Sequence, residues 1–249
     1  MQIMSVLSDG RAKPVSVQEI SNKTGLPKPT CIHILNTLAE DGYVIKVSHS
    51  SGYILGASTY YLTRFGKYNQ SFVTVCRPVT KWLFKQTGFP VILAVIQGNR
   101  KYVIDRIDDE FFQGPQKEDI FTDDIYRTAT GRAIMAHMDE PDVRKIYETY
   151  GPPLKNHWGE VDSYETLTKK LGEIKGLDYI LTRSTERGYV SYGYAKPIFE
   201  RRQCVGALGV AAYCEPADEE NYLAKTHPKV LSALNKAAKE IDRRMRFNV

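Results

Sequence analysis

The segment GLPKPTCIHILNTLAEDGYV, residues 25–44, carries hydrogen-bonding side chains on the outer face of an expected helix. Apolar residues recur at i, i+3, i+4 and i+7 and predict a helix buried along one stripe: Cys31, Ile34, Leu35 and Leu38. Thr30, His33 and Asn36 then point away from that stripe. Hydroxyl, imidazole and amide groups both donate and accept hydrogen bonds, which is the chemistry that reads base edges in the major groove of DNA.

Enzymatic chemistry would need a nucleophile beside a base, paired carboxylates or metal ligands, and the chain shows none of these patterns. Its five histidines are scattered without ligand spacing: His33, His49, His137, His157 and His227. Acidic residues at 108–110 and 123–124 lie in an expected loop over 108–124 and read as solvated charge. The four cysteines form no C-x-x-C pair, so we expect reduced thiols. We therefore expect neither an enzyme nor a bound metal or cofactor.

The elements around the polar helix predict how it is positioned. Pro29 suits a first helical turn, and Gly42 suits a left-handed stop. Upstream, Ser16 and Glu19 have capping-box spacing, and Gly25 ends that helix in a tight turn. Residues 43–55 read as two short strands around a Ser-His-Ser-Ser-Gly turn. This order predicts a winged helix-turn-helix over residues 1–57; a small helical packing module that binds no nucleic acid is the alternative.

The rest of the chain predicts a linker helix over 58–70 and an α+β domain over 71–249. Its sheet is mainly antiparallel, its helices flank the sheet, and a helix over 227–246 closes the chain. In the helix at 70–88 we expect Trp82 to face inward, and we expect the Asp162/Glu165 pair to cap the helix at 163–175.

Charge and hydropathy agree with a nucleic-acid partner and with a cytoplasmic location. The net charge is +5. Residues 1–70 hold seven basic and four acidic residues, so most of the excess positive charge lies in the N-terminal part of the chain. No window approaches eighteen apolar residues, and the N-terminus lacks a signal pattern, so no membrane partner is expected.

The order of several stretches along the chain resembles the IclR family of transcriptional regulators. These are SVQEISNKTGLPKPTCIHILNTLAEDGYV, GYILG, TATGRAIMAH and AKPIFERRQCVGALGV. The resemblance implies an N-terminal winged helix-turn-helix and a C-terminal GAF-like effector-binding domain. It also implies three partners: double-stranded operator DNA, a small organic-acid or aromatic effector, and a second copy of the chain in a homodimer or a dimer of dimers.

The recognition helix departs from the family pattern at two positions. Family members usually open it Lys-Ser-Thr and carry an Arg three residues after the Thr, whereas this chain has Pro29 and His33 there. We therefore expect this chain to recognise a different operator sequence from those of such family members, and to bind it more weakly. Asn36 has an alternative role as a helix-surface polar residue. The expected DNA contacts lie in the major groove, near phosphate and in the wing: Lys28, Pro29, Thr30, His33 and Asn36; Arg11 and Ser16; Lys46, His49 and Ser50.

By the same resemblance the effector would bind at the TATGRA segment, beside strands that follow it. The expected residues are Thr128, Ala129, Thr130, Gly131, Thr182, Arg183, Tyr192, Gly193, Tyr194, Val210 and Ala212. Amides at the start of a helix favour an anion, Arg183 could pair a carboxylate, and the tyrosines indicate a larger or aromatic acid. The alternatives are that the tyrosines only pack the sheet, and that the C-terminal domain serves only oligomerisation.

Overall fold

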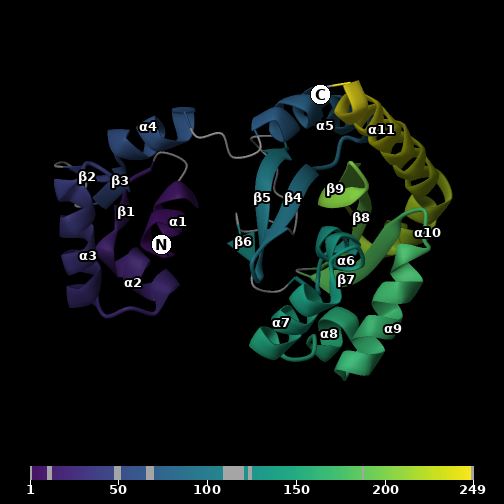
Figure 1. The fold of residues 1–249 in the computed structure, drawn as a ribbon, viewed down its shortest axis with the longest axis horizontal. Helices are drawn as coiled ribbons and strands as arrows, with labels where there is room; N and C mark the ends of the chain where they lie inside the picture. Colours follow the sequence, from purple (N-terminus) through teal and green to yellow (C-terminus); the bar gives the residue numbers. More distant parts are fainter. Residues whose placement is uncertain are drawn as a thin grey trace. The chain divides into compact units, whose positions relative to one another are not determined.

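A computed structural model describes residues 2–9, 13–47, 52–65, 70–108, 121–122, 125–186 and 188–247. The chain divides into two compact units, residues 1–70 and 71–249 (Figure 1). The predicted fold class, a winged helix-turn-helix followed by a sheet flanked by helices, is confirmed.

The first unit is built from short helices and a three-stranded antiparallel sheet in the order β1-β3-β2. Its elements are α1 (Gln2–Asp9), β1 (Val15–Ser16), α2 (Val17–Thr24), α3 (Lys28–Glu40), β2 (Val44–Val47), β3 (Gly52–Leu55) and α4 (Ala57–Phe65). The two-residue strand β1, which pairs with β3, was not predicted, because two residues carry no periodicity.

Local chemistry sets the ends of α2 and α3. The Ser16 hydroxyl accepts a hydrogen bond from the Glu19 amide at 3.2 Å, as expected of an N-cap. The Glu19 carboxylate pairs with Lys23, one turn onward, at 3.2 Å, so the expected reciprocal bond of a capping box is replaced by an i,i+4 ion pair. Gly25 and Gly42 both take left-handed backbone, with φ of 70° and 71°.

The second unit contains a six-stranded antiparallel sheet in the order β6-β5-β4-β9-β8-β7. The strands are β4 (Val91–Gln97), β5 (Arg100–Ile107), β6 (Phe121–Thr122), β7 (Ile180–Glu186), β8 (Tyr189–Glu200) and β9 (Gln203–Cys214). The helices are α5 (Gln70–Thr87), α6 (Ala129–Met135), α7 (Glu140–Tyr150), α8 (Lys155–Trp158), α9 (Tyr164–Lys175), α10 (Glu219–Asn221) and α11 (His227–Phe247); η1 (Pro216–Asp218) and η2 (Tyr222–Thr226), a π-helical turn, flank α10.

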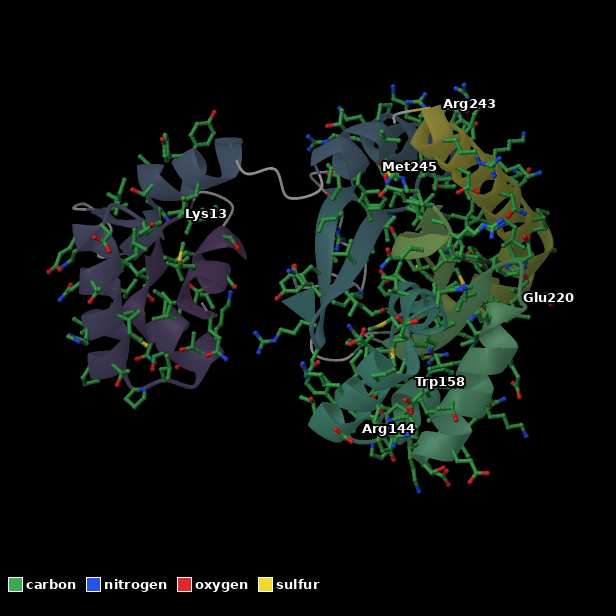
Figure 2. All side chains as sticks on the ribbon, in the orientation of Figure 1. Lys13, Arg144, Trp158, Glu220, Arg243 and Met245 are labelled. Carbon is green, nitrogen blue, oxygen red and sulfur yellow. The ribbon has the colours of Figure 1, made fainter. Side chains whose placement is uncertain are left out.

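Each face of this sheet packs against its own layer of helices (Figure 1). One face lies under α5 and α11, and the other under α6, α7 and α9. In Figure 2 Met245 and Arg243 mark the two sides of α11: Met245 is 8% exposed, and the Arg243 side chain is 61% exposed. The two layers matter for the site because successive strand residues alternate between them.

Three expectations for this unit are wrong. Trp82 is 38% exposed, because its position on α5 lies at the edge of the buried stripe. Ser163, and not the Asp162/Glu165 pair, caps α9: its hydroxyl accepts from the Thr166 amide at 3.2 Å, and the Thr166 hydroxyl oxygen accepts from the Ser163 amide at 3.0 Å. The expected loop at 108–124 contains β6, which pairs with β5.

Candidate functional site

The outer face of α3 exposes the five residues that were expected to reach the major groove. Cys31 and Leu35 are fully buried beneath the helix and hold it against the first unit's core. The exposed residues are Lys28, Pro29, Thr30, His33 and Asn36. The buried stripe thus fixes the helix, while its polar side chains remain free to contact another molecule.

The other expected DNA contacts lie in several elements. Ser16 is exposed at the start of α2, and Lys46 is exposed on β2. Arg11, His49 and Ser50 lie outside the described residues. The start of α4 is bonded to the turn after α3, because the Ser58 hydroxyl donates to the Asp41 carbonyl at 2.8 Å. The Gly56 amide likewise donates to the Tyr43 carbonyl at 2.7 Å, so α4 is anchored to the helix-turn-helix.

In the second unit a small cavity lies between the start of α6 and strands β7, β8 and β9. Its volume is about 40 Å³. Gly209 allows α6 to approach the sheet here, because a Cβ at this position would lie 2.6 Å from the Thr130 methyl. A Cβ on Gly193 would lie 3.4 Å from the Ala129 Cβ of α6 and 2.5 Å from the hydroxyl of Thr182 on the neighbouring strand β7. Among the described residues, no aspartate or glutamate lines this cavity.

Thr128 provides a hydrogen-bond donor on the cavity wall. Its hydroxyl oxygen accepts from the Lys101 ammonium at 3.1 Å, from the Gly131 amide at 3.1 Å and from the Thr130 hydroxyl at 3.4 Å. These bonds use both lone pairs of the oxygen, so its own hydrogen must be donated elsewhere. Among the hydrogen bonds of the described residues, Thr128 Oγ1 acts only as an acceptor. Thr128 can therefore donate to a ligand in the cavity.

Some expected effector residues are brought together at this cavity and others are not. Thr128, Ala129, Thr130, Thr182, Arg183, Gly193, Tyr194 and Val210 border it. Gly131 does not: a Cβ there would lie 2.0 Å from the Ile125 carbonyl oxygen, so this glycine serves the close packing of α6. Tyr192 and Ala212 do not border it either.

Strand alternation directs the expected strand side chains away from the cavity. Tyr192, Tyr194, Val210 and Ala212 all belong to the core on the α5 and α11 side of the sheet, opposite to Thr130. The Tyr194 hydroxyl bonds there with the Tyr222 hydroxyl at 2.9 Å and His227 Nδ1 at 2.8 Å. Tyr194 and Val210 thus border the cavity without directing their side chains into it, and the tyrosines give it no aromatic wall.

Arg183 also has a different partner from the one expected. Its guanidinium donates two hydrogen bonds to the Glu219 carboxylate, at 2.7 and 2.9 Å, and the Tyr192 hydroxyl donates to the same carboxylate. These bonds lower the pKa of Glu219 to about 2 and raise the pKa of Arg183. The expected pairing of Arg183 with an effector carboxylate is replaced by this ion pair.

Several residues at the cavity were missed from sequence. Arg127, Asn156, His157 and Ser184 border it, and Lys101 lies fully buried behind Thr128 and Thr130. Asn156 and His157 come from α8, a four-residue helix too short for a periodic signal. Close to them, the Arg132 guanidinium stacks over the Trp158 ring at 4.1 Å (Trp158 is labelled in Figure 2). Lys101 lies between Arg100 and Tyr102 in β5, a strand without regular apolar/polar alternation, so no local pattern marked it as inward-facing.

Three further features bear on the kind of site. All four cysteines are free thiols. Across the described ranges, no cluster of three or more His, Cys, Asp or Glu side chains is placed to hold a metal ion. Within the same ranges, no helix has the length and apolar character needed to cross a membrane.

The comparisons with known proteins identify the family. The IclR helix-turn-helix domain model matches residues 1–48, and the model for the bacterial transcriptional regulator IclR C-terminal matches residues 68–243. The chain therefore belongs to the IclR family of transcriptional regulators, which bind DNA through a helix-turn-helix and are not enzymes.

Individual relatives match over nearly the whole chain. The glycerol operon regulatory protein of Streptomyces coelicolor is 23% identical over 247 residues, covering 94% of this chain and 90% of that protein. An IclR homologue from Microbacterium hydrocarbonoxydans, whose structure is a complex with 4-hydroxybenzoate, superposes with a TM-score of 0.71 at 17% identity, covering 99% and 98% of the two chains. An IclR regulator from Alicyclobacillus acidocaldarius gives a TM-score of 0.69 at 18% identity, covering 98% and 95%.

Proposed function

We propose that this regulator binds operator DNA through α3, and that a small carboxylate in the cavity beside Thr128 changes the affinity for DNA. The observation that carries the effector proposal is the Thr128 hydroxyl, which has a hydrogen to donate into a cavity that no described acidic side chain lines. A carboxylate oxygen accepts such a bond more strongly than a neutral group does.

The cavity volume supports a small acid. About 40 Å³ holds roughly three water molecules, which is room for a carboxylate and one or two more atoms. The expectation of a larger or aromatic acid rested on tyrosines whose side chains lie on the other face of the sheet. The 4-hydroxybenzoate bound to the Microbacterium homologue supports the carboxylate class, and a ring of that size would require the walls of this cavity to move.

At the DNA, we propose that His33, Asn36 and Thr30 contact base edges while Lys28 and Lys46 contact phosphates. All five side chains are exposed, while Cys31 and Leu35 on the opposite side of α3 are buried. This exposure supports their contact with DNA. Ser16 at the start of α2, together with Arg11, His49 and Ser50, completes the proposed interface.

Self-association is the third part of the proposal. Successive residues of α4 expose large side chains: Tyr60 by 67%, Tyr61 by 67% and Leu62 by 56%. Apolar surface of this kind commonly marks a protein interface. We infer a homodimer, which would present two copies of α3 to a two-fold symmetric operator.

Thermal unfolding in the presence of single acids tests the effector proposal. Acetate, glyoxylate, pyruvate, benzoate and 4-hydroxybenzoate would each be added to the full chain. An acid at one hundred times its Kd stabilises the folded state by about 2.7 kcal/mol, which raises Tm by roughly 5–10 °C for a domain of this size. We expect a small acid to give such a shift and to change the Kd for DNA selected from a random library.

Variants of Thr128 show whether the shift arises in this cavity. Thr128→Val removes the hydroxyl and should abolish the shift, whereas Thr128→Ser keeps the hydroxyl and should retain it. Thr168→Val, on the exposed face of α9, is the matched control. If none of the acids changes Tm or DNA affinity, the proposed carboxylate effector is overturned, and the result favours the alternative in which the C-terminal domain serves only oligomerisation.

A further inference from the structure

Ile32 is a large apolar side chain on the outer face of α3. It is 42% exposed, and it belongs to none of the core clusters formed by the described residues. The neighbouring Cys31 and Leu35 hold the helix, so Ile32 is not needed to seat it. Helical spacing places Ile32 next to Pro29 and Asn36, three residues before it and four after it.

The chemistry of the major groove gives this side chain a specific partner. Phosphates attract cations, and most base edges present hydrogen-bonding groups, which an isoleucine cannot satisfy. Thymine alone among the four bases presents an apolar group in the major groove, its 5-methyl. An isoleucine beside Asn36, which can hydrogen-bond to a base, is therefore suited to contact thymine.

We propose that Ile32 packs against a thymine 5-methyl group and makes the operator require thymine at one position of each half-site. The inference rests on the proposed entry of α3 into the major groove. It adds a specificity residue that recognises a base by apolar contact, beside His33 and Asn36, which can recognise bases only by polar contacts. Pro29, one turn earlier on the same face, extends the apolar surface.

The size of the effect follows from the burial of one methyl group. Removing it costs a factor of about four in affinity. A symmetric dimer with the change in both half-sites should lose about sixteenfold. Uracil is the sharp probe, because it differs from thymine only by this methyl and keeps every hydrogen-bonding group.

The experiment begins with selection of a preferred site from a random DNA library by the full-length chain. Each thymine of the selected duplex is then replaced in turn by uracil, and the Kd is measured by fluorescence anisotropy. For the unsubstituted protein we expect a loss of about fourfold at one position per half-site and no loss elsewhere. Ile32→Ala should bind the thymine and uracil duplexes equally.

Two matched variants separate this contact from general effects. Leu154→Ala removes an aliphatic side chain of the second unit that is 62% exposed, and it should keep the thymine preference. Ile45→Ala removes the other exposed isoleucine of the first unit, 48% exposed on β2, and it should keep that preference as well. Because Ile32 is exposed, Ile32→Ala should retain the Tm of the unsubstituted protein.

The outcomes distinguish a failure of the Ile32 assignment from a failure of the proposed DNA binding by α3. If the protein tolerates uracil at every position, or if Ile32→Ala still prefers thymine, the assignment of Ile32 is overturned while DNA binding by α3 stands. Loss of the preference in Ile45→Ala instead would assign the methyl contact to β2 and also overturn it. If selection enriches no sequence, the proposed reading of DNA by α3 itself fails.

Discussion

Gly209 lies where β9 meets α6, and replacing it by alanine tests the packing that forms the cavity. The added Cβ would lie 2.6 Å from the Thr130 methyl and 3.1 Å from the Tyr194 carbonyl oxygen. Carbon atoms do not approach to 2.6 Å, so the Thr130 side chain or α6 itself must shift. Overpacking of this kind costs about 1–3 kcal/mol. For a domain of this size we expect Gly209→Ala to lower Tm by roughly 2–12 °C.

Gly172 provides a comparison with the same chemical change and the opposite sign. It is exposed within α9, and a Cβ there would meet nothing within 4 Å. Replacing a helical glycine by alanine gains about 0.5–1 kcal/mol, because alanine loses less backbone freedom on folding. Gly172→Ala should raise Tm by roughly 1–4 °C.

Both variants are measured by circular dichroism during thermal unfolding, with urea titrations as a second readout. The methyl of Gly209→Ala also reaches the cavity wall, so this variant alone should bind the small acids more weakly. Equal shifts of Tm in the two variants, or stabilisation by Gly209→Ala, would contradict the close approach of α6 to the sheet.

Three other changes have calculable outcomes. Leu35→Ala empties a fully buried position beneath α3 and should cost about 2–5 kcal/mol, comparable to the whole stability of a unit of this size; DNA affinity should be lost while the second unit still melts cooperatively. Ser163→Ala removes the α9 cap and should lower Tm by roughly 2–4 °C. Hydrogen bonds from Arg183 and Tyr192 lower the pKa of Glu219 from 4.5 to about 2, so its stabilisation is present above pH 4.5 and is lost as pH falls toward 2. Glu219→Gln should flatten the fall in Tm over that range, and an unchanged pH profile would contradict the role of the ion pair.

The sequence was a good guide to helices whose apolar side chains repeat in register. In α11, the helix expected over 227–246, Val230, Leu234 and Ile241 recur at helical spacing, and each is at most 1% exposed. The same holds for Cys31 and Leu35 of α3. When an apolar stripe repeats over several turns, many residues define the buried face of the helix. An error at one residue near its end therefore does not change which face is predicted to be buried.

Short elements and pairings distant in sequence could not be predicted in this way. α8 has four residues and β6 has two, so neither contains a full period. The ion pair between Arg183 and Glu219 joins residues 36 positions apart, and its formation depends on where the segment after β9 returns to the sheet. No local pattern around Arg183 distinguishes a guanidinium free for a ligand from one held by Glu219.

The expected effector site shows why a positional error matters more on a strand than on a helix. Displacing a residue by one position rotates it about 100° around a helix, and a side chain can still reach the same neighbours. On a strand the same displacement moves the side chain to the opposite face of the sheet. Gly193 borders the cavity, whereas the side chains of Tyr192 and Tyr194 on either side of it pack toward α11. Thr128 to Thr130, at the start of a helix, therefore remain at the cavity, while the tyrosines chosen from the strand belong to the other layer.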